Sequence, residues 1–216
     1  SLRAAARIDA SSALPALRKA IRSRGAEVRM GAIRTLSDHG NIAAMDDLLA
    51  LARKSGDEAE HAIALRGYWR LAALTTDRPA ADRLTLVRAG FKQARSDDDR
   101  KAGLGVLSGI ASKDALEYAE SFRKSEAVRA EAESAAYQIA TRIFVVEREV
   151  AERTLATLAA EGKEERLRAD AAGFAAQLAE GNSYIVPWLV SQPYRVQGKT
   201  ALELFDTPLG PELPDG

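Results

Sequence analysis

The stretch IDASSALPALRKAIRSRGAEVRMGAIRTLSDHGN, Ile8 to Asn41, contains the signals for two consecutive helices. Ser12 is placed to accept the first free backbone N–H groups of a helix, and Pro15 falls in the first turn, where its missing N–H costs little. Gly25 interrupts the pattern, and the run from Asp38 to Asn41 is typical of a helix end. The stretch therefore predicts one helix, a short break and a second helix.

Apolar residues recur at spacings of three and four in both predicted helices, which gives each helix one apolar face. A single helix pair cannot bury both faces, whereas stacked pairs can bury them against their neighbours. The first helix presents Leu14, Leu17 and Ile21, and in the second helix we expect Val28, Ala32, Ile33 and Leu36 to point inward.

The two-helix pattern returns along the chain. Leu2 to Leu17 matches Ile33 to Leu48 at an offset of 31 residues, and Gly31 falls on Gly67 and then on Gly103 at steps of 36. Because internal repetition decides the fold, we expect an all-α solenoid of about five helix pairs. The pairs after the first are predicted over residues 44–75, 80–111, 114–142 and 146–180.

The segment from Glu126 to Glu161 contains no Gly, Pro, Asn or Asp. We place a turn near RIFVVER, Arg142 to Arg148, because β-branched residues lower helix propensity. One long helix through the whole segment is the alternative.

The charge and composition argue against some classes of protein, although a local basic patch stays possible. Lys plus Arg and Asp plus Glu number 31 each, so the net charge is zero, whereas a dedicated nucleic-acid binder carries a basic excess. Without cysteine, the chain can form neither disulfides nor thiolate metal sites. No apolar run approaches the roughly 18 residues that span a bilayer, so we expect no membrane partner.

No group of residues predicts a catalytic or metal site. We place His39 in a turn and His61 on the outer part of a helix start, far apart in the repeats. The run Gly103 to Gly109 lacks the Lys-Ser/Thr of a phosphate loop and fits close helix packing instead. Asp97 to Asp99 precede a helix beginning near Arg100, where carboxylates favour the helix dipole. We therefore expect no catalytic residues, no metal and no cofactor.

The most suggestive surface combines aromatic and basic residues in the second repeat. Arg66 and Arg70 stand four residues apart and share a helix face, while Trp69 is predicted to face the core. Arg34 occupies the aligned position one repeat earlier. We expect Arg34, Arg66, Tyr68 and Arg70 to form a binding surface.

The stretch from Ile8 to Asn41 resembles a HEAT repeat of the bacterial HEAT-like type. It has the Asp-containing turn at Asp9, the ALPAL-type first helix at Ala13 to Leu17, and a second helix that opens with Val28-Arg29. The resemblance implies a right-handed α-α superhelix whose second helices line an inner groove. It implies a non-catalytic interaction or scaffold module, with a protein or a neighbouring domain of the same chain as partner.

HEAT families also use a turn Asp and a helix Arg as a structural ladder between repeats. The resemblance assigns this role to Asp9, Arg29, Arg129 and Arg168. In the second unit Ala64-Leu65 stands where Val-Arg is expected, so the ladder is predicted to be interrupted there.

Similar repeats occur in DNA glycosylases for alkylated bases, which implies a DNA-binding role as a further alternative. Those proteins carry cationic and aromatic residues across several repeats. Here the aligned positions Arg34, Arg70 and Val106 are followed by acidic Glu131 and Glu133.

The segment Trp188 to Glu212 resembles the opening of bacterial β-sandwich modules of carbohydrate-binding or glycosidase type, with Gln192 where Gly is usual. We therefore expect a HEAT-like domain over residues 1–181 and a short non-helical tail over 182–216, the linker and first strand of a following domain. This resemblance implies an accessory module of a secreted carbohydrate-active enzyme, in the periplasm or outside the cell. Alternatively, Trp188 and Tyr194 fold back and cap the last helix pair.

Two substitutions test the predicted inward face. Ala32→Asp should bury an unpaired charge, and Gly31→Leu should overpack a close helix contact, so both should lower the melting temperature. An unchanged melting temperature for Ala32→Asp would mean that the inward face is assigned wrongly.

Overall fold

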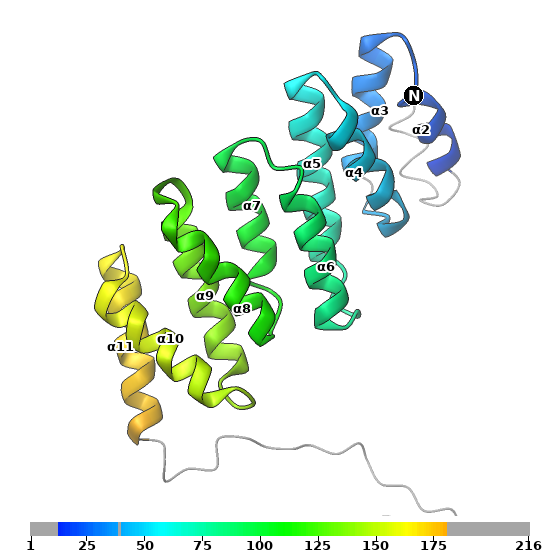
Figure 1. Cartoon of the computed structure of the whole chain (residues 1–216). Coiled ribbons are helices and arrows are strands. Elements are labelled where there is room, and N and C mark those ends of the chain that lie inside the picture. The colour runs from blue at the N-terminus through cyan, green and yellow to red at the C-terminus, as the bar shows by residue number, and fades with distance from the viewer. Residues whose placement is uncertain (1–12, 39, 181–216) are drawn as a thin grey trace, which may run out of the picture. The chain divides into compact units, whose positions relative to one another are not determined.

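The computed structural model describes residues 13–38 and 40–180, and these form helices joined by short turns (Figure 1). In chain order the helices are α2 (Leu14–Ala20), α3 (Ala26–Asp38), α4 (Met45–Lys54), α5 (Glu58–Ala73), α6 (Ala80–Phe91), α7 (Asp97–Leu107), α8 (Lys113–Ser121), α9 (Arg129–Ile143), α10 (Arg148–Glu161) and α11 (Glu165–Glu180). Short 3₁₀ turns occupy Ile42–Ala44, Phe122–Lys124 and Glu126–Val128. No strand occurs among the described residues.

The ten α-helices form five consecutive pairs, and the pairs stack in two layers (Figure 1). The first helices α2, α4, α6, α8 and α10 lie in one layer, and the second helices α3, α5, α7, α9 and α11 lie in the other. The second helices pack directly on one another, α3 on α5, α5 on α7 and α7 on α9. The prediction of an all-α solenoid of five helix pairs is therefore confirmed.

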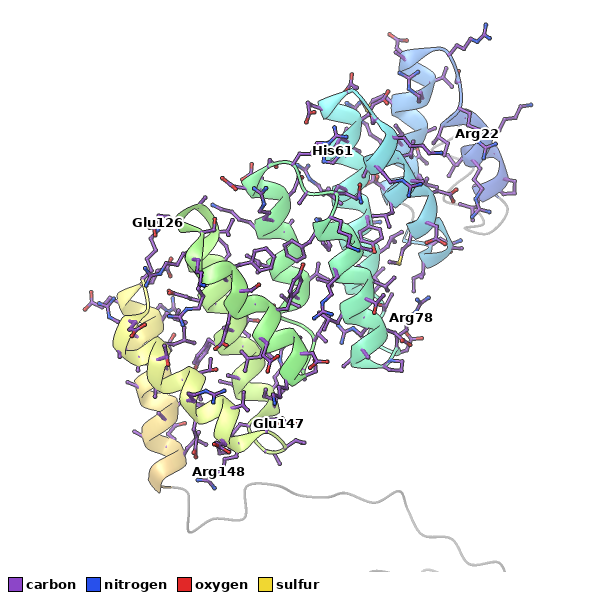
Figure 2. The ribbon with its side chains drawn as sticks, viewed as in Figure 1. Arg22, His61, Arg78, Glu126, Glu147 and Arg148 are labelled. Carbon is purple, nitrogen blue, oxygen red and sulfur yellow. The ribbon has the colours of Figure 1, made fainter. Side chains whose placement is uncertain are left out.

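The segment between Glu126 and Glu161 contains two helices rather than one. The α9 helix ends at Ile143 and α10 begins at Arg148, as the turn predicted at RIFVVER requires. The backbone N–H groups of Val146 and Glu147 both donate to the Ile143 carbonyl oxygen and close this turn. Figure 2 shows Glu126 and Glu147 at opposite ends of α9.

Of the seven apolar residues predicted to point inward in the first pair, five are buried, Ile21 is partly buried against the core, and Val28 is exposed. Leu14, Leu17, Ala32, Ile33 and Leu36 lie in the core, as expected. Val28 is 50% exposed, so its predicted inward position is wrong. It lies beside α2 on the side of the stack that no described helix covers. The proposed cap residue Ser12 lies outside the described residues, and α2 begins after Ala13 without a side-chain cap.

Trp69 of α5 joins the second and third helix pairs. Its ring stacks edge-on against Phe91, with the ring centroids 5.3 Å apart. The faces of α6 and α7 that meet the indole carry Gly90 and Gly103, where an added Cβ would stand 2.7 Å and 2.8 Å from indole carbons. Glycine is needed at both positions because the indole occupies the space of a side chain.

Close packing is predicted at Gly31 and along the run Gly103 to Gly109, and it is found at Gly103 but not at Gly105, where no atom lies within 4 Å of an added Cβ. Gly67, aligned with Gly31, is also closely packed. A Cβ at Gly67 would stand 2.8 Å from the Ser37 Cα atom, so α5 and α3 approach closely there. At Gly31, by contrast, no atom lies within 4 Å of such a Cβ. The expected close contact at Gly31 is therefore wrong, because no described helix packs against this side of α3.

Basic side chains near the starts of the second helices bind the turns between helices. Arg29 Nη1 donates to the Ser23 carbonyl oxygen at 3.1 Å, and its Nε donates to Glu60 of the next pair at 2.6 Å. Arg168 Nη1 donates to the Gly162 carbonyl oxygen at 2.8 Å. These bonds satisfy carbonyl groups that the helix ends leave without intrahelical partners.

In the second unit, where the ladder pattern is absent, the link to the next pair comes from other residues. His61 is buried, so its predicted outer position is wrong. Its Nδ1 lies 2.8 Å from the Ala52 carbonyl oxygen, and its Nε2 lies 3.4 Å from Asp99 Oδ2. Asp99 also closes a capping box with Ser96. The Asp97–Asp99 run marks a helix start as predicted, but α7 begins at Asp97 rather than near Arg100, so the three carboxylates lie in its first turn.

Glu133 of α9 is the most deeply buried carboxylate of the described repeats, with a fully buried side chain. Arg129 Nε donates to it at 2.8 Å, Lys163 N–H donates at 2.7 Å, and Arg123 lies 3.5 Å away. Arg129 also donates to the Glu161 carbonyl oxygen at 2.8 Å. Burial alone raises the pKa of Glu133, but these donors and positive charges outweigh it and hold the pKa below its ordinary value.

Two glycine substitutions separate close contact from open space. Gly103→Ala should lower the free energy of unfolding by about 1–3 kcal/mol, because the methyl group meets Phe91 and Trp69. Gly31→Ala should raise it by up to about 1 kcal/mol, because alanine favours helix and nothing obstructs it. Urea unfolding measures both, and a Gly103→Ala variant as stable as the wild type would contradict the described packing.

Glu133→Gln should lower the free energy of unfolding at neutral pH by on the order of 3 kcal/mol, because Arg129 and Arg123 lose a buried counter-charge. Because the pKa of Glu133 is lowered in the native state, the ionised carboxylate stabilises the fold fully at pH values above its ordinary pKa of 4.5. This stabilisation is lost as the pH falls through the native pKa. The difference between variant and wild type should therefore shrink in acid. Thermal unfolding from pH 7 to pH 3 checks this.

The control is Glu126→Gln, since Glu126 is exposed and its pairing with Lys163 is at the surface. Its melting temperature should stay close to that of the wild type at every pH. Equal effects of the two substitutions would contradict a special role of the buried carboxylate.

Candidate functional site

Three of the four predicted binding residues surround one pocket on the layer of second helices. The pocket lies between α3 and α5 and has a volume of about 290 Å³. Its lining comprises Arg34, Ser37 and Asp38 from α3 and Ile63, Arg66, Gly67 and Arg70 from α5. We call it the α3–α5 pocket.

Helical spacing and the close approach of the two helices create this pocket. Ile63, Arg66 and Arg70 fall at intervals of three and four and so share one face of α5. At the base, Gly67 leaves room for Ser37, whose hydroxyl donates to the Ile63 carbonyl oxygen at 3.1 Å. The short contact between the helices brings Arg34 to the same pocket as the two arginines of α5.

The pocket is electropositive. All three arginines are exposed, and none forms a hydrogen bond or ion pair with another described residue. Asp38 is the single carboxylate of its lining. Elsewhere exposed arginines often have a partner, as Arg18 does with Asp47 at 2.8 Å. The α3–α5 pocket therefore has three guanidinium groups against one carboxylate, and none of the three is ion-paired among the described residues.

Tyr68 does not belong to this pocket. Its side chain is 1% exposed, and its hydroxyl donates to the Leu86 carbonyl oxygen at 2.7 Å. Burial, with the Asp46 carboxylate as a second cause, raises the pKa of Tyr68 to about 12. The structure thus replaces the expected surface role of Tyr68 by a core role, because its position on α5 faces the first-helix layer.

Sequence reasoning did not select Ser37, Asp38 and Ile63. Ser37 and Asp38 follow Arg34 by three and four residues, and Ile63 precedes Arg66 by three. This spacing places each on the same helix face as a predicted arginine. The spacing was therefore a usable signal, but which two helix faces meet depends on the stacking.

The acidic residues further along the second helices are engaged elsewhere. Glu131 pairs with Lys101 at 3.1 Å, and Glu133 is buried among the donors described above. Val106, aligned with Arg70 on the next repeat, is half-buried and uncharged. Of the residues that the sequence singled out on this layer, the exposed arginines without a described partner are thus on α3 and α5.

The proposed ladder residues lie away from the α3–α5 pocket. Arg29, Arg129 and Arg168 all donate to backbone carbonyl oxygens near the turns between first and second helices. Asp9 lies outside the described residues, as does His39.

Over residues 13–38 and 40–180 no three His, Asp or Glu side chains converge as metal ligands would. In the same ranges, each helix is too short or too polar to traverse a lipid bilayer.

Comparison with known proteins adds the family. The model of the family described as HEAT repeats matches residues 1–66 of the chain. No match emerges among curated proteins or among solved structures. The matched range includes α2, α3, α4 and the first half of α5, and the same pairing of helices continues to α11. Residues 1–66 are thus similar to HEAT repeats, and the five stacked helix pairs from α2 to α11 form an all-α stack that is consistent with this similarity.

Proposed function

We propose that this protein is a non-catalytic interaction module that holds an acidic segment of a protein partner in the α3–α5 pocket. HEAT repeats are commonly protein-interaction or scaffold modules, and the match over residues 1–66 supports a role of this kind. The observation that carries the finer proposal is the group of Arg34, Arg66 and Arg70 around one pocket without carboxylate partners among the described residues.

The chemistry of the pocket favours carboxylates. A guanidinium group binds a carboxylate through two parallel N–H···O bonds, and such charge-assisted bonds are stronger than neutral ones. Ile63 adds an apolar contact beside the arginines, and Asp38 disfavours acidic groups at its own edge. A partner segment with two or three acidic side chains and one apolar side chain fits this arrangement.

The dimensions of the pocket favour a peptide over a nucleic acid. Its basic residues come from two neighbouring helices, and its volume of about 290 Å³ is the size of a few side chains. Binding to a duplex needs positive charge along several phosphates, and the chain has no net positive charge. On the next second helix, α7, the exposed residues include the uncharged Ala102 and Gly105, which could not bind phosphate groups through a positive charge.

A neighbouring domain of the same chain is an equally acceptable partner, because an acidic segment can be supplied within one polypeptide. The link to a secreted carbohydrate-active enzyme rests on residues 182–216, which lie outside the described residues. That role, the domain boundary and the proposed capping by Trp188 and Tyr194 stay predictions.

Charge reversal in the pocket tests the proposal. The probe is a fluorescent peptide of about 12 residues that contains three Glu and one Leu. Gly and Pro at its other positions keep it from forming a helix. Arg66→Glu combined with Arg70→Glu should raise its Kd at least tenfold in fluorescence anisotropy, because both changes replace attraction by repulsion. Binding should also weaken as salt rises from 50 to about 300 mM.

The matched control is Arg78→Glu combined with Arg166→Glu, which changes the net charge equally on exposed side chains outside the pocket. It should leave the Kd within about twofold of the wild type. Equal losses in the two double variants would show only a general charge effect. Tighter binding of a DNA duplex than of the peptide, also lost with Arg66 and Arg70, would favour the nucleic-acid alternative.

A further inference from the structure

A second groove lies on the opposite layer, between the first helices α4 and α6. Its volume is about 580 Å³, twice that of the α3–α5 pocket. It is lined by Asp46, Leu49, Ala50 and Arg53 of α4, by Thr85, Arg88 and Ala89 of α6, and by Lys92 and Gln93 just after the end of α6. We call it the α4–α6 groove.

The lining residues form one continuous face on each helix. On α4 the lining residues are at positions 46, 49, 50 and 53, so they are three, one and three residues apart. Positions 85, 88, 89 and 92 repeat this spacing on α6 and just after it, and position 93 follows. Such positions follow a single stripe along a helix. The groove is therefore bounded by two parallel stripes, each about 10–12 Å long at 1.5 Å per residue.

The α4–α6 junction differs from the other junctions between first helices. Arg18 of α2 pairs with Asp47 of α4, Arg88 of α6 lies over the Tyr118 ring of α8, and Thr154 of α10 donates to Glu120 of α8. No hydrogen bond, ion pair or ring contact among the described residues joins α4 to α6 themselves. Just after α6, Arg95 donates to the Ala52 carbonyl oxygen of α4 at 3.3 Å and to the Ser55 carbonyl oxygen at 2.9 Å. The two segments are thus joined at one end, while the facing stripes of α4 and α6 carry no such contact.

Tyr68 of α5 contacts α6 from the core side. Its side chain is buried, and its hydroxyl donates to the Leu86 carbonyl oxygen of α6 at 2.7 Å. The Asp46 carboxylate of α4 contributes to the raised pKa of Tyr68, so α4 also lies near this residue.

The groove combines an apolar floor with a positively charged rim. Leu49, Ala50 and Ala89 are half-buried, while Arg53 and Lys92 are exposed. With Arg88 the rim has three cations against the single carboxylate of Asp46. Neither Arg53 nor Lys92 forms an ion pair with another described residue. Small apolar floor residues accept side chains of about leucine size, and the rim attracts acids.

We propose that the α4–α6 groove docks an acidic amphipathic helix of a partner protein, about three turns long. A helix laid in a groove buries its apolar stripe on the floor while acidic residues on either side meet the cations. The charge of the rim selects an acidic helix over a basic one. The site uses residues and a layer different from those of the α3–α5 pocket, so the protein can hold two partner segments at once.

The test uses a fluorescent helical peptide of about 15 residues with a Leu/Ala stripe flanked by Glu, and a second peptide with Lys in place of Glu. The wild-type protein should bind the Glu peptide and bind the Lys peptide at least tenfold more weakly in fluorescence anisotropy. Arg53→Glu combined with Lys92→Glu should weaken the Glu peptide at least tenfold. Ala89→Trp, which fills the floor, should do the same without changing charge.

The matched control is the Arg78→Glu and Arg166→Glu double variant, which changes the net charge equally outside both sites and should bind the helical peptide as the wild type does. Thermal unfolding followed by circular dichroism identifies variants that do not fold, and only folded variants are compared. Equal binding of the Glu and Lys peptides would overturn the proposal, as would no binding at millimolar peptide. Loss of binding in the Arg66/Arg70 variant but not in the groove variants would assign the peptide to the α3–α5 pocket instead.

Discussion

The packing of the Trp69 indole against two glycines is the interaction on which the centre of the stack depends. A helix pair cannot bury both of its apolar faces alone, so each pair needs close contact with the next. At the junction of the second and third pairs, Gly90 and Gly103 make room for the indole, and Phe91 closes against it. A bulky residue here must be matched by glycines on the facing helices, because the packed interior between helices has no spare volume.

The same helix, α5, serves both the α3–α5 pocket and the core. One face presents Arg66 and Arg70 beside α3, while Tyr68 on the other side is buried and donates to the backbone of α6. Neighbouring residues of one helix point in directions about 100° apart, so residues close together in the sequence can have different surroundings. The arrangement gives one helix a basic exposed face and a core face that meets the opposite layer.

Arginines serve two distinct purposes in this protein. Those near the starts of second helices donate to backbone carbonyl groups and hold the turns, as Arg29 and Arg168 do. Those around the α3–α5 pocket have no described partner and remain available to an outside anion. Because exposed ion pairs contribute little to stability, leaving the second group unpaired costs the fold little.

The sequence alone determined the helix pairs, their number and most of their breaks, because apolar spacing, prolines and glycines act locally. It also located the turn at RIFVVER, where β-branched residues weaken the helix, and three arginines of the pocket. Tertiary structure decided the rest. Gly31 and Gly67 look equivalent in the repeat, yet only Gly67 meets a neighbour closely. His61 and Tyr68 look like surface residues, yet stacking buries both. Burial depends on which helix lies opposite, and that partner lies in another repeat.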